Sequence, residues 1–174
     1  RRTPAPLTKA GRIRRMLITA AVPNVVIVLI IMAIALGGLM LAGSPMAWWY
    51  TIVAEAWMVF NLAPVSAADV HISFLPALPA LILAVVVAVR VRSAVKHKVS
   101  VKDLLTLLAC VLGVPVVFTI IAWLMLWDAG KVYDVSPPNL AQALLRVIVL
   151  HLAAMASGMG WRLWRALAKR YGVP

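Results

Sequence analysis

Long apolar runs bounded by clusters of positive charge constrain the fold of this chain more than any other feature. Met16–Leu41 holds 26 residues, and as a helix it would rise about 39 Å, enough to cross ~30 Å of hydrocarbon. Leu104–Trp127 and Leu140–Met159 are further runs of this kind. Only 13% of the residues are charged, whereas a soluble domain has about 25%. The sequence therefore predicts an all-α integral membrane protein.

The positions of the charges predict the orientation of the chain. Fifteen of the 17 lysines and arginines lie in Arg1–Arg15, Arg90–Lys102 and Arg162–Arg170, each beside an apolar run. The cytoplasmic flanks of membrane helices carry such an excess of positive charge. We therefore expect a multi-pass protein of the plasma membrane with both ends of this segment in the cytoplasm.

The net charge of +12 invites a nucleic-acid partner, but its concentration beside the apolar runs argues against one. Anionic lipid headgroups are the expected partners of such basic flanks. The cations that we expect at this inner face are Arg12, Arg14, Arg15, Arg90, Arg92, Arg162 and Arg165.

Two regions are expected along the chain. Residues 1–15 are predicted to form a basic cytoplasmic segment, and residues 16–174 a single transmembrane helical domain. The abrupt Gly-Val-Pro ending leads us to expect that this region is the N-terminal part of a longer chain.

The stretch Ala47–Leu62 is helix-like but has only 16 residues, about 24 Å, which is short for a crossing. If this stretch and Phe74–Val91 both crossed, the cations of Arg90–Lys102 would lie outside, against the charge rule. We therefore predict about four transmembrane helices, with Ala47–Leu62 as a re-entrant or half-membrane helix. The alternative exchanges the roles of the two stretches.

A faint internal repeat favours that alternative. Val22-Pro23 and Ser44-Pro45 recur as Val114-Pro115 and Ser136-Pro137, both at an offset of 92 residues. Internal repeats are common in transporter folds, and in the second copy Leu140–Met159 is long enough to cross.

Glu55 and Arg146 are the sharpest pair of intramembrane polar residues, since both are predicted ~10–12 Å below the outer face. Opposite charges at one depth could form an ion pair, either as a structural staple or as part of a proton or ion pathway. His151 lies five residues deeper than Arg146. It is expected to be a neutral ring bonded to its surroundings or a proton relay. Asn61 is expected to cap the half-membrane helix.

Asp69 and His71 fall in a polar segment that we expect to face outer water. Two such ligands make a poor metal site, and no third is near in sequence. The single Cys110 lies in an apolar run and is read as a small buried residue. The sequence contains no P-loop, GxSxG, HExxH or CxxC motif. We therefore predict no metal, no cofactor and no enzymatic activity.

The stretch Ala56–Arg92 carries an apolar helix with Trp57, a polar turn, and an Ile72-Ser73 entry with Pro76 and Pro79 into a Leu-rich span. In this it resembles the family of actinobacterial polytopic membrane proteins that includes the cell-division protein PerM. The stretch Gly160–Leu167 is similar to the inner-face segment of that family. The resemblance implies an integral membrane factor that supports septation and envelope integrity through contacts with divisome membrane proteins.

The function predicted from the sequence is accordingly a non-enzymatic interaction or stabilising factor for cell-division or cell-envelope membrane machinery. The alternative is a transporter or channel component with an intramembrane site of Glu55, Arg146 and His151.

Overall fold

The computed structural model describes residues 8–63, 65–67, 70–72, 77–95, 101–133 and 135–172. Most of these residues are helical, which confirms the predicted all-α class. The helices are α1 (Lys9–Ala42), the short 3₁₀ helix η1 (Met46–Trp48), α2 (Trp49–Phe60), α3 (Ala77–Ala94), α4 (Val101–Ala129) and α5 (Leu140–Tyr171). The strands β1 (Val65–Ala67), β2 (Val70–Ile72) and β3 (Val135–Ser136) form one small antiparallel sheet in the order β2-β1-β3, which the sequence analysis did not predict.

Three helices, α1, α4 and α5, are long and apolar enough to cross a membrane. Their outward faces carry large apolar side chains, such as Ile34 on α1 and Val149 on α5, as expected where lipid replaces water. These features support a membrane-embedded protein.

The first helix begins earlier than predicted, at Lys9 instead of Met16. Thr8 is the N-cap, and its side-chain oxygen accepts a hydrogen bond from the Gly11 backbone N–H at 3.1 Å. Such a cap satisfies one of the backbone donors that every helix leaves unpaired at its start. The basic residues Arg12, Arg14 and Arg15 are therefore helical and continue α1 beyond its apolar part.

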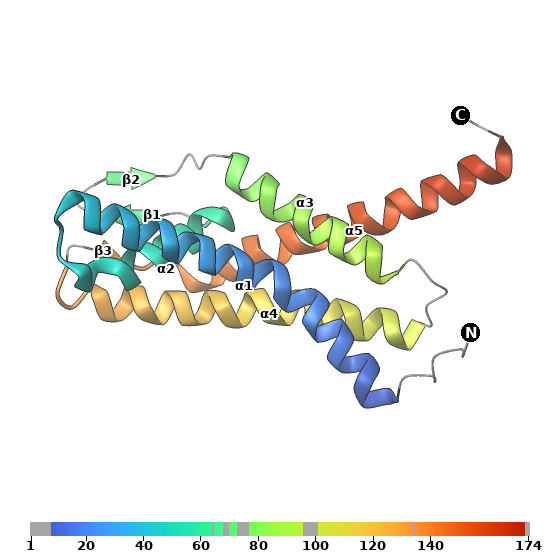
Figure 1. Ribbon diagram of the computed structural model, residues 1–174, viewed down its shortest axis with the longest axis horizontal. Helices are drawn as coiled ribbons and strands as arrows, with labels where there is room; N and C mark the ends of the chain where they lie inside the picture. The colour runs from blue at the N-terminus through green and yellow to red at the C-terminus, as the bar shows by residue number, and fades with distance from the viewer. Residues whose placement is uncertain are drawn as a thin grey trace.

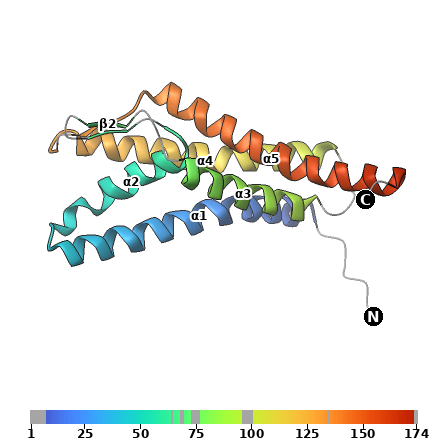
Figure 2. The ribbon, with the colours of Figure 1, turned by 90° about the horizontal axis from the view of Figure 1, so that it is seen from above.

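The helices run roughly lengthwise through an elongated molecule (Figure 1). The first turn of α1, the last turns of α3 and α5 and the first turn of α4 lie toward one end, and the sheet lies toward the other. Figure 2 shows α2 leaving the end of α1 and running back along only part of the molecule before the chain turns. At 12 residues, α2 rises about 18 Å. It packs between α1 and α4, and the buried Trp57 and Met58 on its inner face belong to the hydrophobic core.

Prolines interrupt both α1 and α4. Pro23 and Pro115 lie inside these helices, each fourteen residues after the first helical residue, and both are buried. A proline in a helix interior donates no hydrogen bond to the carbonyl four residues earlier and bends the helix. Figure 1 shows such a bend in the N-terminal half of α1. The starts of the two helices, Lys9 and Val101, are separated by the same 92 residues as the sequence repeat.

The tightest helix contact joins α3 to α5. A Cβ atom added to Gly158 would clash with the backbone oxygen of Ala88, so only glycine allows the two backbones to approach this closely. Close approach through small residues is a common basis of helix association in membranes, where burial of apolar surface contributes little.

Gly158→Ala is expected to lower the free energy of unfolding by about 1–3 kcal/mol, because the added methyl group must displace the α3 backbone. Equilibrium unfolding in detergent, followed by circular dichroism, measures the change. Gly160→Ala is the matched control: nothing lies within 4 Å of its Cβ position. Replacing glycine in a helix there should be neutral or stabilise by up to about 1 kcal/mol. Equal effects of the two substitutions would contradict the close contact.

Candidate functional site

The C-terminal end of α2 lies inside the bundle and is closed by a specific turn. The Leu62 N–H donates to the Val59 carbonyl at 3.1 Å, and the Ala63 N–H donates to the Met58 carbonyl at 2.9 Å. Leu62 has a φ of 60°, so the pattern is that of a Schellman motif with leucine where glycine is usual. Holding a leucine in this left-handed conformation costs about 1 kcal/mol or more. The surrounding contacts must therefore stabilise this turn.

Arg146 of α5 supplies one of these contacts. Its Nη1 donates a hydrogen bond to the Leu62 carbonyl at 2.6 Å, which places a positive charge at the negative end of the α2 dipole. No ion pair joins Arg146 to Glu55 in the described part of the chain, in contrast to the predicted pair. The reason is that the carbonyls at the end of a buried helix need donors, and α5 brings the guanidinium to them.

Glu55 and Asn61 take different places on α2. Glu55 is half-buried, and its Oε1 has no hydrogen-bond partner among the described residues. Asn61 is the C-cap residue, and its Nδ2 donates to the Trp57 carbonyl at 3.0 Å. Asn61 thus caps the C-terminal end of α2, as we expected from the sequence.

Arg146→Met is expected to lower the free energy of unfolding by about 1.5–3 kcal/mol, because it removes a hydrogen bond from a charged donor to a carbonyl that has little access to water. Equilibrium unfolding in detergent tests this. When Arg146→Met is combined with Glu55→Gln, the two effects should add within about 0.5 kcal/mol, since the side chains do not pair. A coupling energy larger than this would mean that Glu55 and Arg146 do form an ion pair, which would contradict the structure.

Two consecutive hydrogen bonds link α2 to α4. The Trp57 indole N–H donates to the Thr119 hydroxyl at 3.1 Å, and that hydroxyl donates to the Pro115 carbonyl at 2.7 Å. Trp57 also packs against the ring of Phe118, with ring centroids 5.4 Å apart. Thr119 is fully buried, so its hydroxyl satisfies two groups that water cannot reach.

Thr119→Val is expected to destabilise the protein by about 1–3 kcal/mol, because the buried Trp57 indole N–H loses its acceptor while the side-chain shape is kept. Thr106→Val is the matched control on the same helix. Thr106 also donates to the carbonyl four residues earlier, at 2.9 Å, but no described side chain donates to it. Equilibrium unfolding in detergent should show a lower free energy of unfolding for Thr119→Val than for Thr106→Val. Equal free energies of unfolding would argue against the Trp57–Thr119 hydrogen bond.

His151 belongs to a different polar cluster from the one predicted. It is 1% exposed, and its Nδ1 lies 2.9 Å from the Val147 carbonyl of its own helix. Across a cavity of about 10 Å³ it meets Asn24 of α1 and Arg90 of α3. Three buried atoms of this group have no hydrogen-bond partner in the described part of the chain: Asn24 Oδ1, Arg90 Nε and His151 Nε2.

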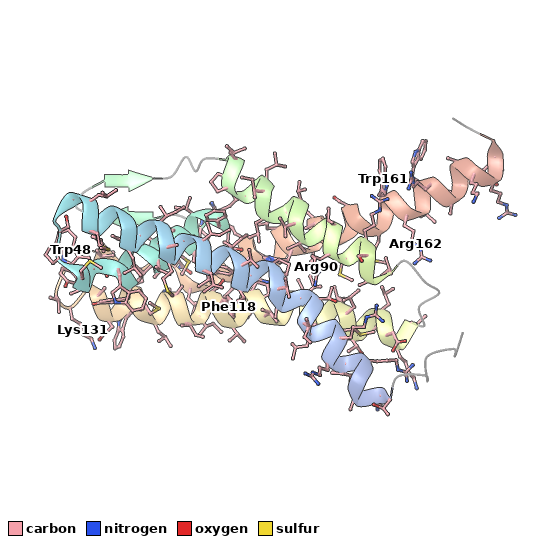
Figure 3. All side chains as sticks on the ribbon, in the orientation of Figure 1. Trp48, Arg90, Phe118, Lys131, Trp161 and Arg162 are labelled. Atoms are coloured by element: carbon pink, nitrogen blue, oxygen red, sulfur yellow. The ribbon has the colours of Figure 1, made fainter. Side chains whose placement is uncertain are left out.

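Sequence reasoning missed Asn24 as a member of this cluster and placed Arg90 at the headgroups. Asn24 directly follows Pro23 inside α1 and is 1% exposed. Arg90 is half-buried with its Nε inside the bundle, and Figure 3 labels it where α3 runs beside α1. An intramembrane asparagine beside a helix-interrupting proline was the available signal.

The remaining inner-face arginines lie on the surface. Arg12 contacts Asp103 of α4 at 3.8 Å, while Arg14 and Arg15 are exposed. Arg92 and Arg165 lie 5.6 Å and 6.0 Å from the centroid of the Trp161 ring. Arg162 is half-buried near Trp161 on α5 (Figure 3).

The predicted outer polar loop is only partly described. Asp69 lies outside the described residues, and His71 is in β2, whose backbone pairs with β1. No three His, Cys, Asp or Glu side chains gather as a metal site would require in the ranges that the structure covers. Cys110 is a half-buried free thiol.

Comparison with known proteins gives no further assignment, since neither a protein-family model nor a solved structure matches this chain.

Proposed function

We propose that this protein is a non-enzymatic integral membrane protein that binds and stabilises other membrane proteins of the cell-division or cell-envelope machinery. One observation carries the proposal: the C-terminal part of α5 projects beyond the bundle (Figure 1). Trp161 and Trp164, on this projecting part, are 50% and 59% exposed, and Leu163 and Tyr171 are exposed too. The division and envelope setting rests on the resemblance of Ala56–Arg92 and Gly160–Leu167 to the actinobacterial family.

The projecting C-terminal part of α5 has the amino-acid composition of a protein-binding surface. Interfaces between proteins are enriched in Trp, Tyr and Arg, and their central residues contribute most of the binding free energy. Trp161 is also held in place, because Arg92 of α3 and Arg165 of α5 both lie over its ring. A preordered aromatic side chain loses less entropy when a partner binds it. The cations nearby suit anionic headgroups at the same level.

The proposed topology has four spans, α1, α3, α4 and α5, with α2 as a half-membrane helix and both ends of the segment cytoplasmic. Its support is that the basic turns of these four helices lie toward the same end of the molecule (Figure 3). At 18 residues, α3 rises about 27 Å, close to a hydrocarbon thickness of ~30 Å. The α5 extension would then lie at the cytoplasmic surface.

A Trp161→Ala, Trp164→Ala double variant is expected to reduce the recovery of partner proteins about tenfold or more, because exposed tryptophans at interfaces often contribute 2 kcal/mol or more to binding. The tagged full-length protein is isolated from native membranes in mild detergent. Mass spectrometry then measures stoichiometric recovery of septal or envelope-assembly membrane proteins.

Trp127→Ala is the control, because Trp127 is similarly exposed (51%) but lies at the opposite end of the bundle, beneath Lys131. This variant should retain the partners. Recovery that does not depend on Trp161 and Trp164 would contradict the proposal. Movement of protons or a solute by the purified protein in liposomes would favour the transporter alternative instead.

A further inference from the structure

A small cavity lies between α1, α3, α4 and α5, and three polar side chains lie among its mostly apolar lining residues. Its volume of about 10 Å³ is about the smallest that admits a water molecule. It is lined by Asn24, Arg90 and His151 together with Thr19, Pro23 and Val111. Asn24 and His151 are both 1% exposed, so their polar atoms have no access to bulk water.

The three unpaired atoms at this cavity differ in hydrogen-bonding role. A carbonyl only accepts, so the contact with Val147 puts the proton of a neutral His151 ring on Nδ1 and leaves Nε2 as an acceptor. Asn24 uses its amide Nδ2 to donate to the Ala20 carbonyl at 2.9 Å, which leaves Oδ1 as a second acceptor. Arg90 Nε carries one hydrogen and is a donor.

The prolines add acceptors to the same place. Pro23 has no N–H for the Thr19 carbonyl, and Pro115 has none for the Val111 carbonyl. Thr19 and Val111 both line the cavity. In membrane helices, carbonyls freed in this way are commonly satisfied by side chains and ordered water. The carbonyls of Thr19 and Val111 are therefore further acceptors on residues that line the cavity.

We infer that this cavity is a binding site for one water molecule that joins Asn24, Arg90 and His151. A water molecule donates two hydrogen bonds, to Asn24 Oδ1 and His151 Nε2, and accepts one from Arg90 Nε. Buried waters in proteins make about three such bonds. The Arg90 guanidinium disfavours a cation at this position, and the lone pairs of the two acceptors disfavour an anion.

The water site gives Arg90 a reason to stay within the bundle. Long cationic side chains near a helix end usually extend toward the headgroups, and Arg92 is indeed exposed, over the ring of Trp161. A bridging water is nearly as good as a direct hydrogen bond. It would connect α3 to the proline-interrupted part of α1 and to α5 at a level where no described ion pair does so.

Solid-state NMR of the full-length protein in lipid vesicles, with ¹⁵N-labelled histidine, tests the site. Magnetisation starts on water protons and is transferred to the protein, and His151 signals are identified by their loss in His151→Gln. The expected result is rapid transfer to His151 Nε2, ahead of Nδ1, because the water lies on the Nε2 side of the ring. Absence of this transfer in the unmodified protein would overturn the inference.

Asn24→Leu should abolish the transfer to Nε2, since leucine has the same branching as asparagine and offers no acceptor. Asn61→Leu is the matched control and should keep it. Asn61 is equally buried and also donates to a carbonyl four residues earlier, but does not line the cavity. Transfer that survives Asn24→Leu, or a direct Arg90-to-His151 hydrogen bond detected as nitrogen–nitrogen coupling, would exclude the bridging water. If Asn24→Leu fails to fold, the measurement on the unmodified protein decides alone.

Discussion

A backbone carbonyl that loses its helical donor inside an apolar bundle must find another donor, and buried polar side chains of this protein lie where this happens. Leaving such a group unpaired costs about 1–3 kcal/mol, a large share of the total stability of a domain. The chain creates the problem three times, at Pro23, at Pro115 and at the end of α2. Polar side chains meet at all three places.

The polar groups at the three places differ. Pro23 and Pro115 free the carbonyls of Thr19 and Val111, and both residues line the cavity of Asn24, Arg90 and His151. The bonds from the Asn24 amide to the Ala20 carbonyl and from the Thr119 hydroxyl to the Pro115 carbonyl are additional bonds within one helix. At the end of α2 the donor is Arg146, which comes from α5, so this bond ties two helices together where α2 ends. The Trp57–Thr119 bond likewise ties α2 to α4.

This combination of local and long-range bonds gives the rigid body that the proposed binding role requires. The core around Trp57 and the close approach of Gly158 to Ala88 hold the helices in one arrangement. The apolar outer faces of α1, α4 and α5 remain for lipid, and the aromatic end of α5 remains uncovered by the bundle. A rigid body with one projecting aromatic helix can present its tryptophans without reordering, which lowers the entropic cost of binding.

Much of the fold was predictable because it depends on properties carried along each segment. Apolar length predicted the long helices, and a 16-residue run predicted the short α2. The small sheet was missed because strands of two or three residues have no periodic signal of their own. The start of α1 was misplaced because the basic turns before Met16 are set by the Thr8 cap and not by hydropathy.

The sequence by itself determined the apolar length of the helices, the all-α class and the position of each polar residue along its helix, because hydropathy and rise per residue depend on one segment at a time. Only the tertiary structure decided which polar residues meet. Glu55 and Arg146, which the sequence predicted at equal depth, do not pair, because Arg146 bonds to Leu62, seven residues beyond Glu55. Asn24, Arg90 and His151, from three separate helices, line one cavity. The reason is physical: depth is a property of one helix, but contact also requires the rotation of each helix about its axis and the choice of its neighbours. These are set by how the helices pack, and above all by the contact of α3 with α5 and of α1 with α4.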